Sequence, residues 1–162
     1  MPGRGIPIRK QLAYVVSVLL LILLSGCGSP KSADILGEEA KLLAQTKVGD
    51  AVVMLGALPS GEWITGIAGD EGTSTQKAVP QLEPTPYLAQ GVAVLSGQAP
   101  PNAVRYELLT REGLILKGKI EGDVYLIAWP ATSDNPGYIL RILNESDDEI
   151  FRWPPPGGLP AA

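Results

Sequence analysis

Between residues 91 and 153 the chain is a series of short apolar or alternating runs separated by turn-forming residues. The alternation is clearest where Val104, Tyr106 and Leu108 are interleaved with charged residues, a pattern typical of a half-buried β-strand. Residues 124–129 are apolar throughout, which predicts a strand covered on both faces. The segments that predict strands are 91–97, 103–110, 114–120, 124–129, 138–143 and 149–153. In the third of these, Lys117 and Lys119 alternate with other residues and are expected to mark one exposed face.

The region 32–68 predicts a helix followed by a β-hairpin. Apolar residues from Ile35 to Leu43 recur at spacings of three and four, which favours an amphipathic helix that begins at a Ser32 or Asp34 cap and ends near Thr46. The apolar runs 51–58 and 62–68 are separated by Pro59-Ser60-Gly61, a typical turn sequence. A helix that packs on its own domain is favoured over one that binds a partner.

Two further segments lack apolar periodicity. Residues 69–90 contain three prolines and many small polar residues, which predicts an extended linker. Within it, Pro84-Thr85-Pro86-Tyr87 fits polyproline II, either as a spacer or as a ligand for an aromatic groove. Three consecutive prolines follow Trp153, so residues 154–162 are expected to form a disordered tail.

Strands that recur about every ten residues predict a mainly β, antiparallel sandwich with its core in residues 91–153. A domain of about 60 residues buries only ~60% of its unfolded surface. We therefore expect the 51–68 hairpin to add strands to the same body. The alternative is two small units joined by the 69–90 linker.

The approach to the strand at 138–143 carries a family resemblance. The segment Asp134-Asn135-Pro136-Gly137-Tyr138 is similar to the Asp-x-Gly-x-Tyr pattern of immunoglobulin-like and fibronectin-like sandwiches, with the glycine displaced by one position. The resemblance implies that Tyr138 forms a tyrosine corner by hydrogen bonding back to the backbone. It also implies an immunoglobulin-like topology for the C-terminal half.

The N-terminal residues have the pattern of a targeting signal. A basic start (Arg4, Arg9, Lys10) precedes the apolar run 12–24, which at 1.5 Å per helical residue spans only about 20 Å of the ~30 Å membrane core. Small residues and the only cysteine, Cys27, follow at once. An uncleaved signal anchor with an incidental thiol is the alternative interpretation.

Leu24-Ser25-Gly26-Cys27 resembles the lipobox of bacterial lipoproteins. The resemblance implies cleavage before Cys27 and attachment of lipid to its thiol. Residues 1–26 would then be the signal peptide, 27–31 the lipid-anchored tether, and 32–68 the helix and hairpin. Because two or three acyl chains hold a protein stably on a bilayer, the expected location is the extracytoplasmic side of the cell membrane.

Composition and charge exclude several kinds of catalytic and metal-binding site and one class of partner. The 162 residues include no histidine and one cysteine, which excludes histidine-based catalytic pairs, histidine metal ligands and an internal disulfide. From residue 27 onward, 10 basic residues face 17 acidic ones, so nucleic acid is not an expected partner. We expect no cofactor or metal.

No catalytic motif is present. The acidic run 144–149 lacks the spacing of a calcium loop and is expected to form a polar turn, while Asp50, Asp70 and Glu71 are scattered along the sequence. No serine lies in a known nucleophile motif. The favoured hypothesis is a non-enzymatic binding or assembly module for an unknown protein or cell-envelope partner. The alternatives are a carboxylate-dependent hydrolase or transferase, and a wall-glycan binder that stacks sugars on Trp63, Trp129 and Trp153.

Overall fold

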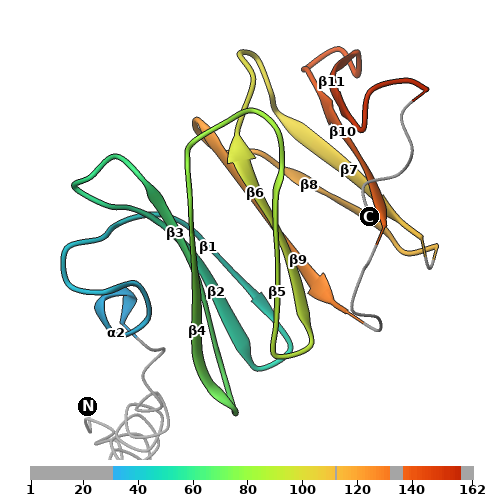
Figure 1. Ribbon diagram of the computed structural model, residues 1–162. Helices are drawn as coiled ribbons and strands as arrows, with labels where there is room; N and C mark the ends of the chain where they lie inside the picture. The colour runs from blue at the N-terminus through green and yellow to red at the C-terminus, as the bar shows by residue number, and fades with distance from the viewer. Residues whose placement is uncertain (1–30, 112, 132–136, 158–162) are drawn as a thin grey trace, which may run out of the picture. The chain divides into compact units, whose positions relative to one another are not determined.

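The computed structural model describes residues 31–111, 113–131 and 137–157 (Figure 1). From Ser32 onward they belong to one compact unit. The described residues form one short helix and eleven strands: α2 (Ser32–Leu36), β1 (Lys41–Val48), β2 (Ala51–Ala57), β3 (Trp63–Gly69), β4 (Gly72–Ala78), β5 (Thr85–Ala89), β6 (Val92–Gln98), β7 (Arg105–Thr110), β8 (Ile115–Lys119), β9 (Val124–Pro130), β10 (Tyr138–Leu143) and β11 (Glu149–Trp153).

The strands pair into three antiparallel sheets. Sheet A has the order β1-β2-β3-β4, sheet B the order β5-β6-β9, and sheet C the order β11-β10-β7-β8. The hairpin predicted at 51–68 and all six strands predicted between 91 and 153 are present. The expectation of a mainly β, antiparallel fold is therefore confirmed.

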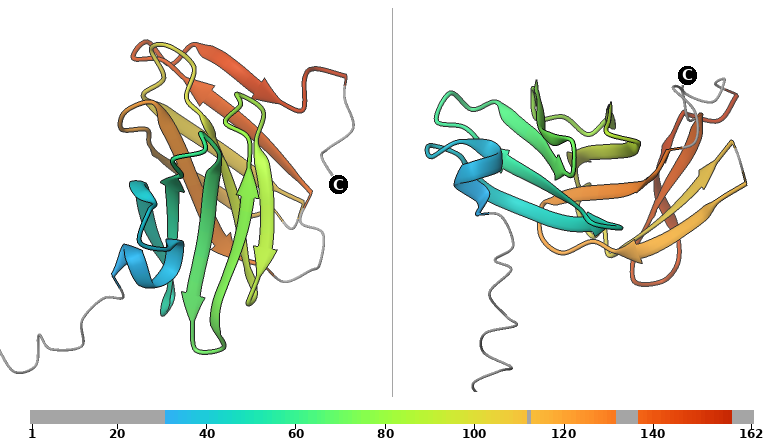
Figure 2. Two further views of the ribbon diagram at one scale, coloured as in Figure 1. Left: turned by 60° about the vertical axis from the view of Figure 1, so that its left-hand side comes forward. Right: turned by 90° about the horizontal axis from the view of Figure 1, so that it is seen from below.

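Sheet B lies between the other two sheets and contributes to two cores (Figure 2). Val92 and Val94 of β6 pack with Val53 and Ile67 of sheet A, whereas the alternate residues of β6 pack against sheet C. A strand with this position must be apolar on both faces, because each face is removed from water. The expectation for residues 124–129 is confirmed in the same way, since β9 is the neighbour of β6 in this sheet.

The helix expected from residue 32 to about residue 46 is wrong beyond Leu36. Gly37 has a φ of 92°, a left-handed conformation that ends the helix, and its N–H donates to the carbonyl of Ala33 at 3.0 Å. Residues 41–48 then form β1, which pairs along its length with β2. Helical spacing of a few leucines is a weak local preference, and backbone pairing with a buried strand overrides it.

The linker expected at 69–90 is also wrong, because it contains β4 and β5. Both are edge strands of their sheets, and an edge strand needs little apolar surface. Proline is tolerated there because one side of the strand makes no ladder bonds. Pro86 and Tyr87 pair with Leu95 and Val94 in an antiparallel ladder, so the segment 84–87 is not a free polyproline II spacer or ligand.

The helix α2 packs closely on sheet A, on the side opposite sheet B. Ile35 and Leu36 are each 3% exposed and lie over Gly66 and Gly56, where the sheet has no side chains. A Cβ atom at Gly56 would lie 2.8 Å from Leu36 Cδ1, and one at Gly66 would overlap Ile35 Cγ2. Glycine is therefore required at both positions by the close approach of the helix.

Two tyrosine rings cover glycines on neighbouring strands. The Tyr125 ring lies across Gly97, its direct partner in the β6–β9 ladder, and its hydroxyl donates to the carbonyl of Leu82 at 3.1 Å. Tyr106 covers Gly118 in the same way between β7 and β8. The first pair ties the segment between β4 and β5 to sheet B, which the linker interpretation did not anticipate.

Candidate functional site

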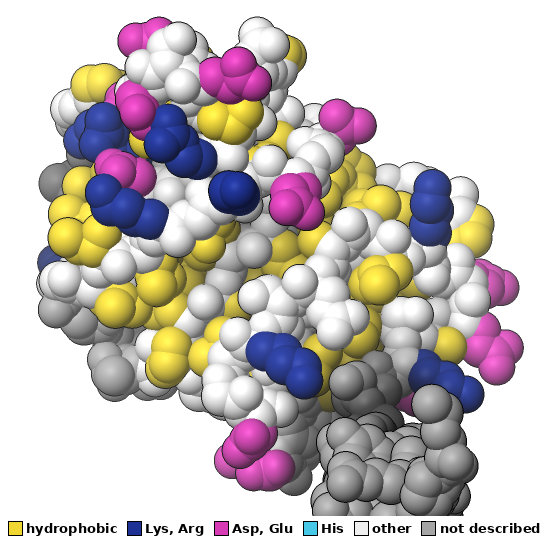
Figure 3. Space-filling view, turned by 180° about the vertical axis from the view of Figure 1, so that it is seen from behind, with side chains coloured by type: hydrophobic (Ala, Val, Ile, Leu, Met, Phe, Trp, Pro, Cys, Tyr) yellow, Lys and Arg dark blue, Asp and Glu magenta, His cyan; other side chains and the backbone are white. Residues whose placement is uncertain are grey.

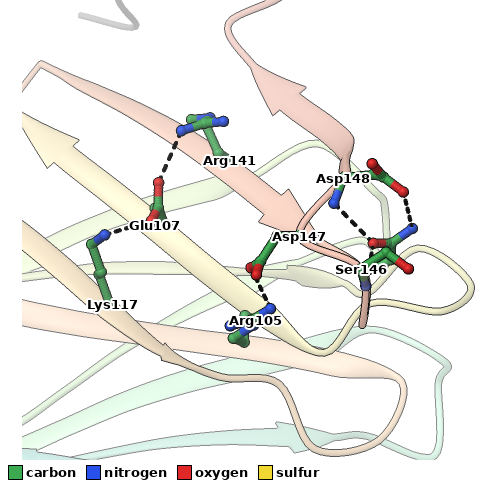
Figure 4. Close-up of polar contacts among 8 residues, drawn as sticks. Arg105, Glu107, Lys117, Arg141, Ser146, Asp147 and Asp148 are labelled. Atoms are coloured by element: carbon green, nitrogen blue, oxygen red, sulfur yellow. Dashed lines mark hydrogen bonds and ion pairs between the residues drawn. The ribbon is translucent and has the colours of Figure 1, made fainter.

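The outward face of sheet C carries a row of alternating charges (Figure 4). Glu107 lies at its centre, with Lys117 Nζ 2.6 Å from Oε1 and Arg141 Nη1 2.9 Å from Oε2. The row continues because Arg141 Nε donates to Glu149 at 2.5 Å. Lys117, Glu107 and Arg141 meet because they are direct partners in the β8-β7-β10 register. Glu149 reaches Arg141 from the neighbouring strand β11, where its own ladder partner is Leu143.

The charge row changes the ionisation of its members. The hydrogen bond from Lys117 holds the pKa of Glu107 below its usual value, and the positive charges of Arg141 and Arg105 act in the same direction. The hydrogen bond to Glu149 raises the pKa of Arg141. Both groups are therefore charged at neutral pH, and the row is an electrostatic feature rather than a proton donor or acceptor.

A second charged row lies one step along the sheet. Arg105 and Lys119 are direct partners in the β7–β8 ladder and share the outward face, although like charges placed opposite each other are unfavourable. Asp147 forms an ion pair with Arg105. Within the described residues, Lys119 has no ion-pair partner. An open groove of about 380 Å³ lies at this position, between Arg105, Lys119 and Asp147.

The next row on the same face is apolar. Ile115, Leu109 and Ile139 are aligned across β8, β7 and β10, and Ile115 and Leu109 are 61% and 43% exposed. Exposed apolar groups beside charged ones are visible on the side of the molecule that sheet C occupies (Figure 3). The outward face of sheet C, defined by these three rows, is the candidate functional site.

Sequence reasoning identified only part of this face. The alternation at 114–120 indicated that Lys117 and Lys119 share an exposed side, and that placement is confirmed. It did not identify the partners of the two lysines, because Glu107 and Arg105 reach them only through the register of the sheet. Ile115 has the same parity as the lysines, which is the signal that could have placed it on this side.

The acidic segment 144–149 is a hairpin turn between β10 and β11, as expected. The Asn144 side-chain carbonyl accepts hydrogen bonds from the N–H groups of Ser146 and Asp148, both at 2.9 Å (Figure 4). Asp147 adopts a φ of 66° in this turn, and its carboxylate forms an ion pair with Arg105. In the described part of the chain, no three acidic or other metal-ligating side chains lie close enough to hold an ion.

The fold gathers Asp50, Asp70 and Glu71 around one pocket of about 380 Å³. They come from the β1–β2 and β3–β4 turns, and the β5–β6 turn adds Gln90, whose side-chain amide donates to the carbonyls of Ile67 and Gly72. All three carboxylates are exposed. The hypothesis of a carboxylate-dependent enzyme requires two carboxylates in one pocket, and these residues are the ones that line such a pocket.

The tryptophans do not form a stacking platform. Trp63 is 8% exposed and Trp129 is 1% exposed, while Trp153 is half-buried against the core between sheets B and C. Because two of the three side chains are buried, the three tryptophans do not share an exposed face. The observation on which the glycan-binding alternative depended is therefore absent from the described residues.

Tyr138 is a core residue. It is 4% exposed, and its ring packs edge-on against Trp129 with the centroids 6.5 Å apart. Burial raises the pKa of Tyr138 to about 12, and a side-chain hydrogen bond with Trp153 opposes that shift. The upstream residues 132–136, where a tyrosine corner would find its backbone acceptor, lie outside the described residues. Cys27 lies outside them as well.

Comparisons of the chain with protein-family models, with curated proteins and with solved structures found no match. Among the described residues, no helix is long and apolar enough to cross a bilayer.

We expect Glu107→Gln to change how stability depends on pH. A carboxylate with a lowered pKa stabilises the folded state above its ordinary pKa of about 4.3, and the contribution is lost as the pH falls through the lower folded value. Wild type should therefore be the more stable protein at pH 7, and the difference should vanish in strong acid. Urea unfolding at both pH values measures it, and a difference that persists unchanged in acid would contradict the prediction.

Proposed function

We propose that this chain is a bacterial lipoprotein, held on the extracytoplasmic side of the cell membrane by lipid on Cys27, and that its β-sheet unit is a non-enzymatic binding or assembly module. The observation that carries the proposal is the order of features in residues 1–27: basic start, short apolar run, small residues and the only cysteine. A lipid anchor suits such a chain because the apolar run is too short to span a bilayer by itself.

Two features of the described residues support a binding role over an enzymatic one. The carboxylates that share a pocket are exposed rather than buried beside one another. The most distinctive surface is the outward face of sheet C, where exposed apolar residues lie next to a charge row. Surfaces that combine the two are typical of protein interaction sites.

An immunoglobulin-like relationship for the C-terminal half is part of the proposal. Its support is the sequence before Tyr138 and the position of this tyrosine in the core between two antiparallel sheets. The carboxylate-dependent enzyme remains the second candidate, and Asp50, Asp70 and Glu71 are the residues on which it would depend. Loss of a measured hydrolytic activity in an Asp70→Asn variant would favour that candidate.

Replacement of Cys27 by alanine tests the anchor. We expect the variant to leave the membrane fraction or to accumulate as an uncleaved precursor, because its side chain has no thiol to carry lipid. Membrane fractionation, gel mobility and incorporation of a labelled fatty acid measure the effect. Ser29→Ala, two residues downstream, is the matched control and should behave as wild type.

The anchor proposal fails if the Cys27→Ala protein is cleaved at the normal site and still stays on the membrane without lipid. It also fails if wild type incorporates no fatty acid. Both results concern Cys27 alone and leave the surface of sheet C untested.

A further inference from the structure

We infer that the outward face of sheet C, along the free edge of β8, is the docking site for an extended acidic segment of a partner protein, which adds to the sheet as a further strand. The inference rests on the proposed binding role, and it names the surface and the kind of partner.

The edge of the sheet supplies the backbone groups. β8 is the last strand of the order β11-β10-β7-β8, and no other described strand pairs with its second edge. An edge strand presents unpaired N–H and C=O groups that an extended chain can satisfy. Every second residue of β8 faces outward, and these residues are Ile115, Lys117 and Lys119, all of them exposed.

The charges on the outward face of sheet C favour an acidic partner. Among the described residues, the ion pairs and the β7–β8 register place five basic residues (Arg105, Lys117, Lys119, Arg141 and Arg152) and three acidic ones (Glu107, Asp147 and Glu149) on this face. The chain from residue 27 onward is acidic, with 10 basic and 17 acidic residues. The positive excess on this face therefore contrasts with the rest of the protein and attracts acidic groups.

Lys119, which has no ion-pair partner among the described residues, is the position at which we expect the strongest contact with the acidic segment. Arg105 and Lys119 face one another across β7 and β8, and Asp147 neutralises only Arg105. A carboxylate placed in the groove between them would pair with Lys119 and remove an unfavourable contact. We therefore expect the added strand to carry an acidic side chain opposite Lys119.

The apolar row completes the pattern. Ile115 lies four residues before Lys119 on the same side of β8 and is continuous with Leu109 and Ile139. An added strand whose outward residues are apolar, acidic and acidic in turn would match Ile115, Lys117 and Lys119 one for one. Lysines on an edge strand repel basic strands, and a neutral strand would remove their charge from water without compensation, so the same residues provide selectivity.

A second copy of this chain fits the face less well. Two such faces brought together would oppose one positive excess to another, which is unfavourable at an interface. An anionic glycan would satisfy the lysines but has no apolar groups for Ile115 and Leu109. An acidic peptide with an apolar residue satisfies all three rows.

A short synthetic peptide tests the inference on the full protein as it is purified from its native cells, carried in nanodiscs only if it fractionates with the membrane. In the peptide, threonine alternates with two glutamates followed by one valine, the order that opposes Lys119, Lys117 and Ile115 in an antiparallel pairing. A fluorescent label reports binding by anisotropy. We expect binding that weakens several-fold between low and physiological salt. Hydrogen exchange should show new protection at the amides of residues 115–119, because strand addition satisfies the backbone.

The double variant Lys117→Glu with Lys119→Glu should lose at least about tenfold in affinity for this peptide and should gain affinity for a version with lysines in place of the glutamates. Lys47→Glu, an exposed lysine on β1, is the control and should bind as wild type does. A peptide methylated on alternate backbone nitrogens should not bind. Lys117→Glu places a carboxylate opposite Glu107, whereas Lys119→Glu places one opposite Arg105. The single variant Lys119→Glu therefore repeats the binding measurement, with the same direction of change expected, in a protein that keeps the Lys117–Glu107 ion pair.

The inference is wrong if the acidic and lysine peptides bind equally well, if Lys47→Glu loses as much affinity as the double variant, or if the methylated peptide binds as well as the unmethylated one. It is also wrong if the new protection from hydrogen exchange lies outside β8. Self-association of the chain through this face in sedimentation experiments would show that a second copy, not an acidic segment, is the occupant. None of these results depends on where the protein is anchored. Failure at β8 is therefore distinguishable from failure of the Cys27 anchor.

Discussion

Substitution of Trp129 by alanine is expected to lower the free energy of unfolding by about 3–5 kcal/mol, the usual cost of removing a large aromatic side chain from a core. Trp129 is 1% exposed and lies among residues of β9, β7 and β10 that join sheet B to sheet C. Its loss also removes the edge-on contact with Tyr138. Urea unfolding followed by circular dichroism measures the change.

Two variants provide the comparison for Trp129→Ala. Trp129→Phe keeps an aromatic ring in the site and should lose less stability than the alanine variant. Leu109→Ala changes a residue that is 43% exposed and should stay within about 0.5 kcal/mol of wild type. A Trp129→Ala protein that is less than about 1 kcal/mol weaker than wild type would show that this residue does not hold the two sheets together.

The urea unfolding curve of Trp129→Ala also tests whether the chain forms two small units that unfold separately. Val94 packs with sheet A, and its neighbour Leu95 packs with sheet C. Because one strand belongs to both cores, disruption of either core should destabilise the other. A single transition is therefore expected in Trp129→Ala as in wild type, and two resolved transitions would contradict the shared central sheet.

Introduction of valine at Gly66 is expected to destabilise the fold by about 1–3 kcal/mol through overpacking. A Cβ atom at this position would overlap the Ile35 side chain and would lie 3.0 Å from Leu36 Cδ2, while the Ile35 carbonyl oxygen at 3.4 Å leaves no spare room for a larger group. We expect α2 to be displaced from sheet A. Thermal unfolding and hydrogen exchange of residues 32–36 measure the two effects.

Two further variants control the Gly66 experiment. Thr75 is the partner of Gly66 in the β3–β4 ladder but is exposed, so Thr75→Val places the same side chain where there is room and should cost little. Ile35→Ala removes the obstructing group, and Gly66→Val should cost less in that background. Equal costs with and without Ile35 would show that the helix does not make the glycine necessary.

The strands were predictable where burial of one or both faces produces an alternating or wholly apolar sequence. The segments from 91 to 153 carry alternating or wholly apolar patterns because their residues face one core or two, and each of these strands is present in the structure. The edge strand β4 carries no such mark, since its side chains are alternately exposed and half-buried. Its sequence consequently resembles that of a linker.

The error at residues 37–46 has a different origin. The apolar residues there have helical spacing, but Gly37 ends the helix and β2 offers a complete ladder to the residues that follow. Local periodicity competes with pairing to a strand that is close in sequence and buried in the core, and the pairing contributes more stability. No single sequence window shows which of the two prevails.

The sequence by itself determined the lipoprotein-like pattern around Cys27, the antiparallel β class and the exposed side of Lys117 and Lys119, because each depends on residues adjacent or alternating along the chain. Only the tertiary structure decided that sheet B is shared by two cores, that the tryptophans are buried, and that Lys119 faces Arg105 beside an apolar row. Those features depend on register and layer order, which bring together residues distant in sequence and leave no local pattern.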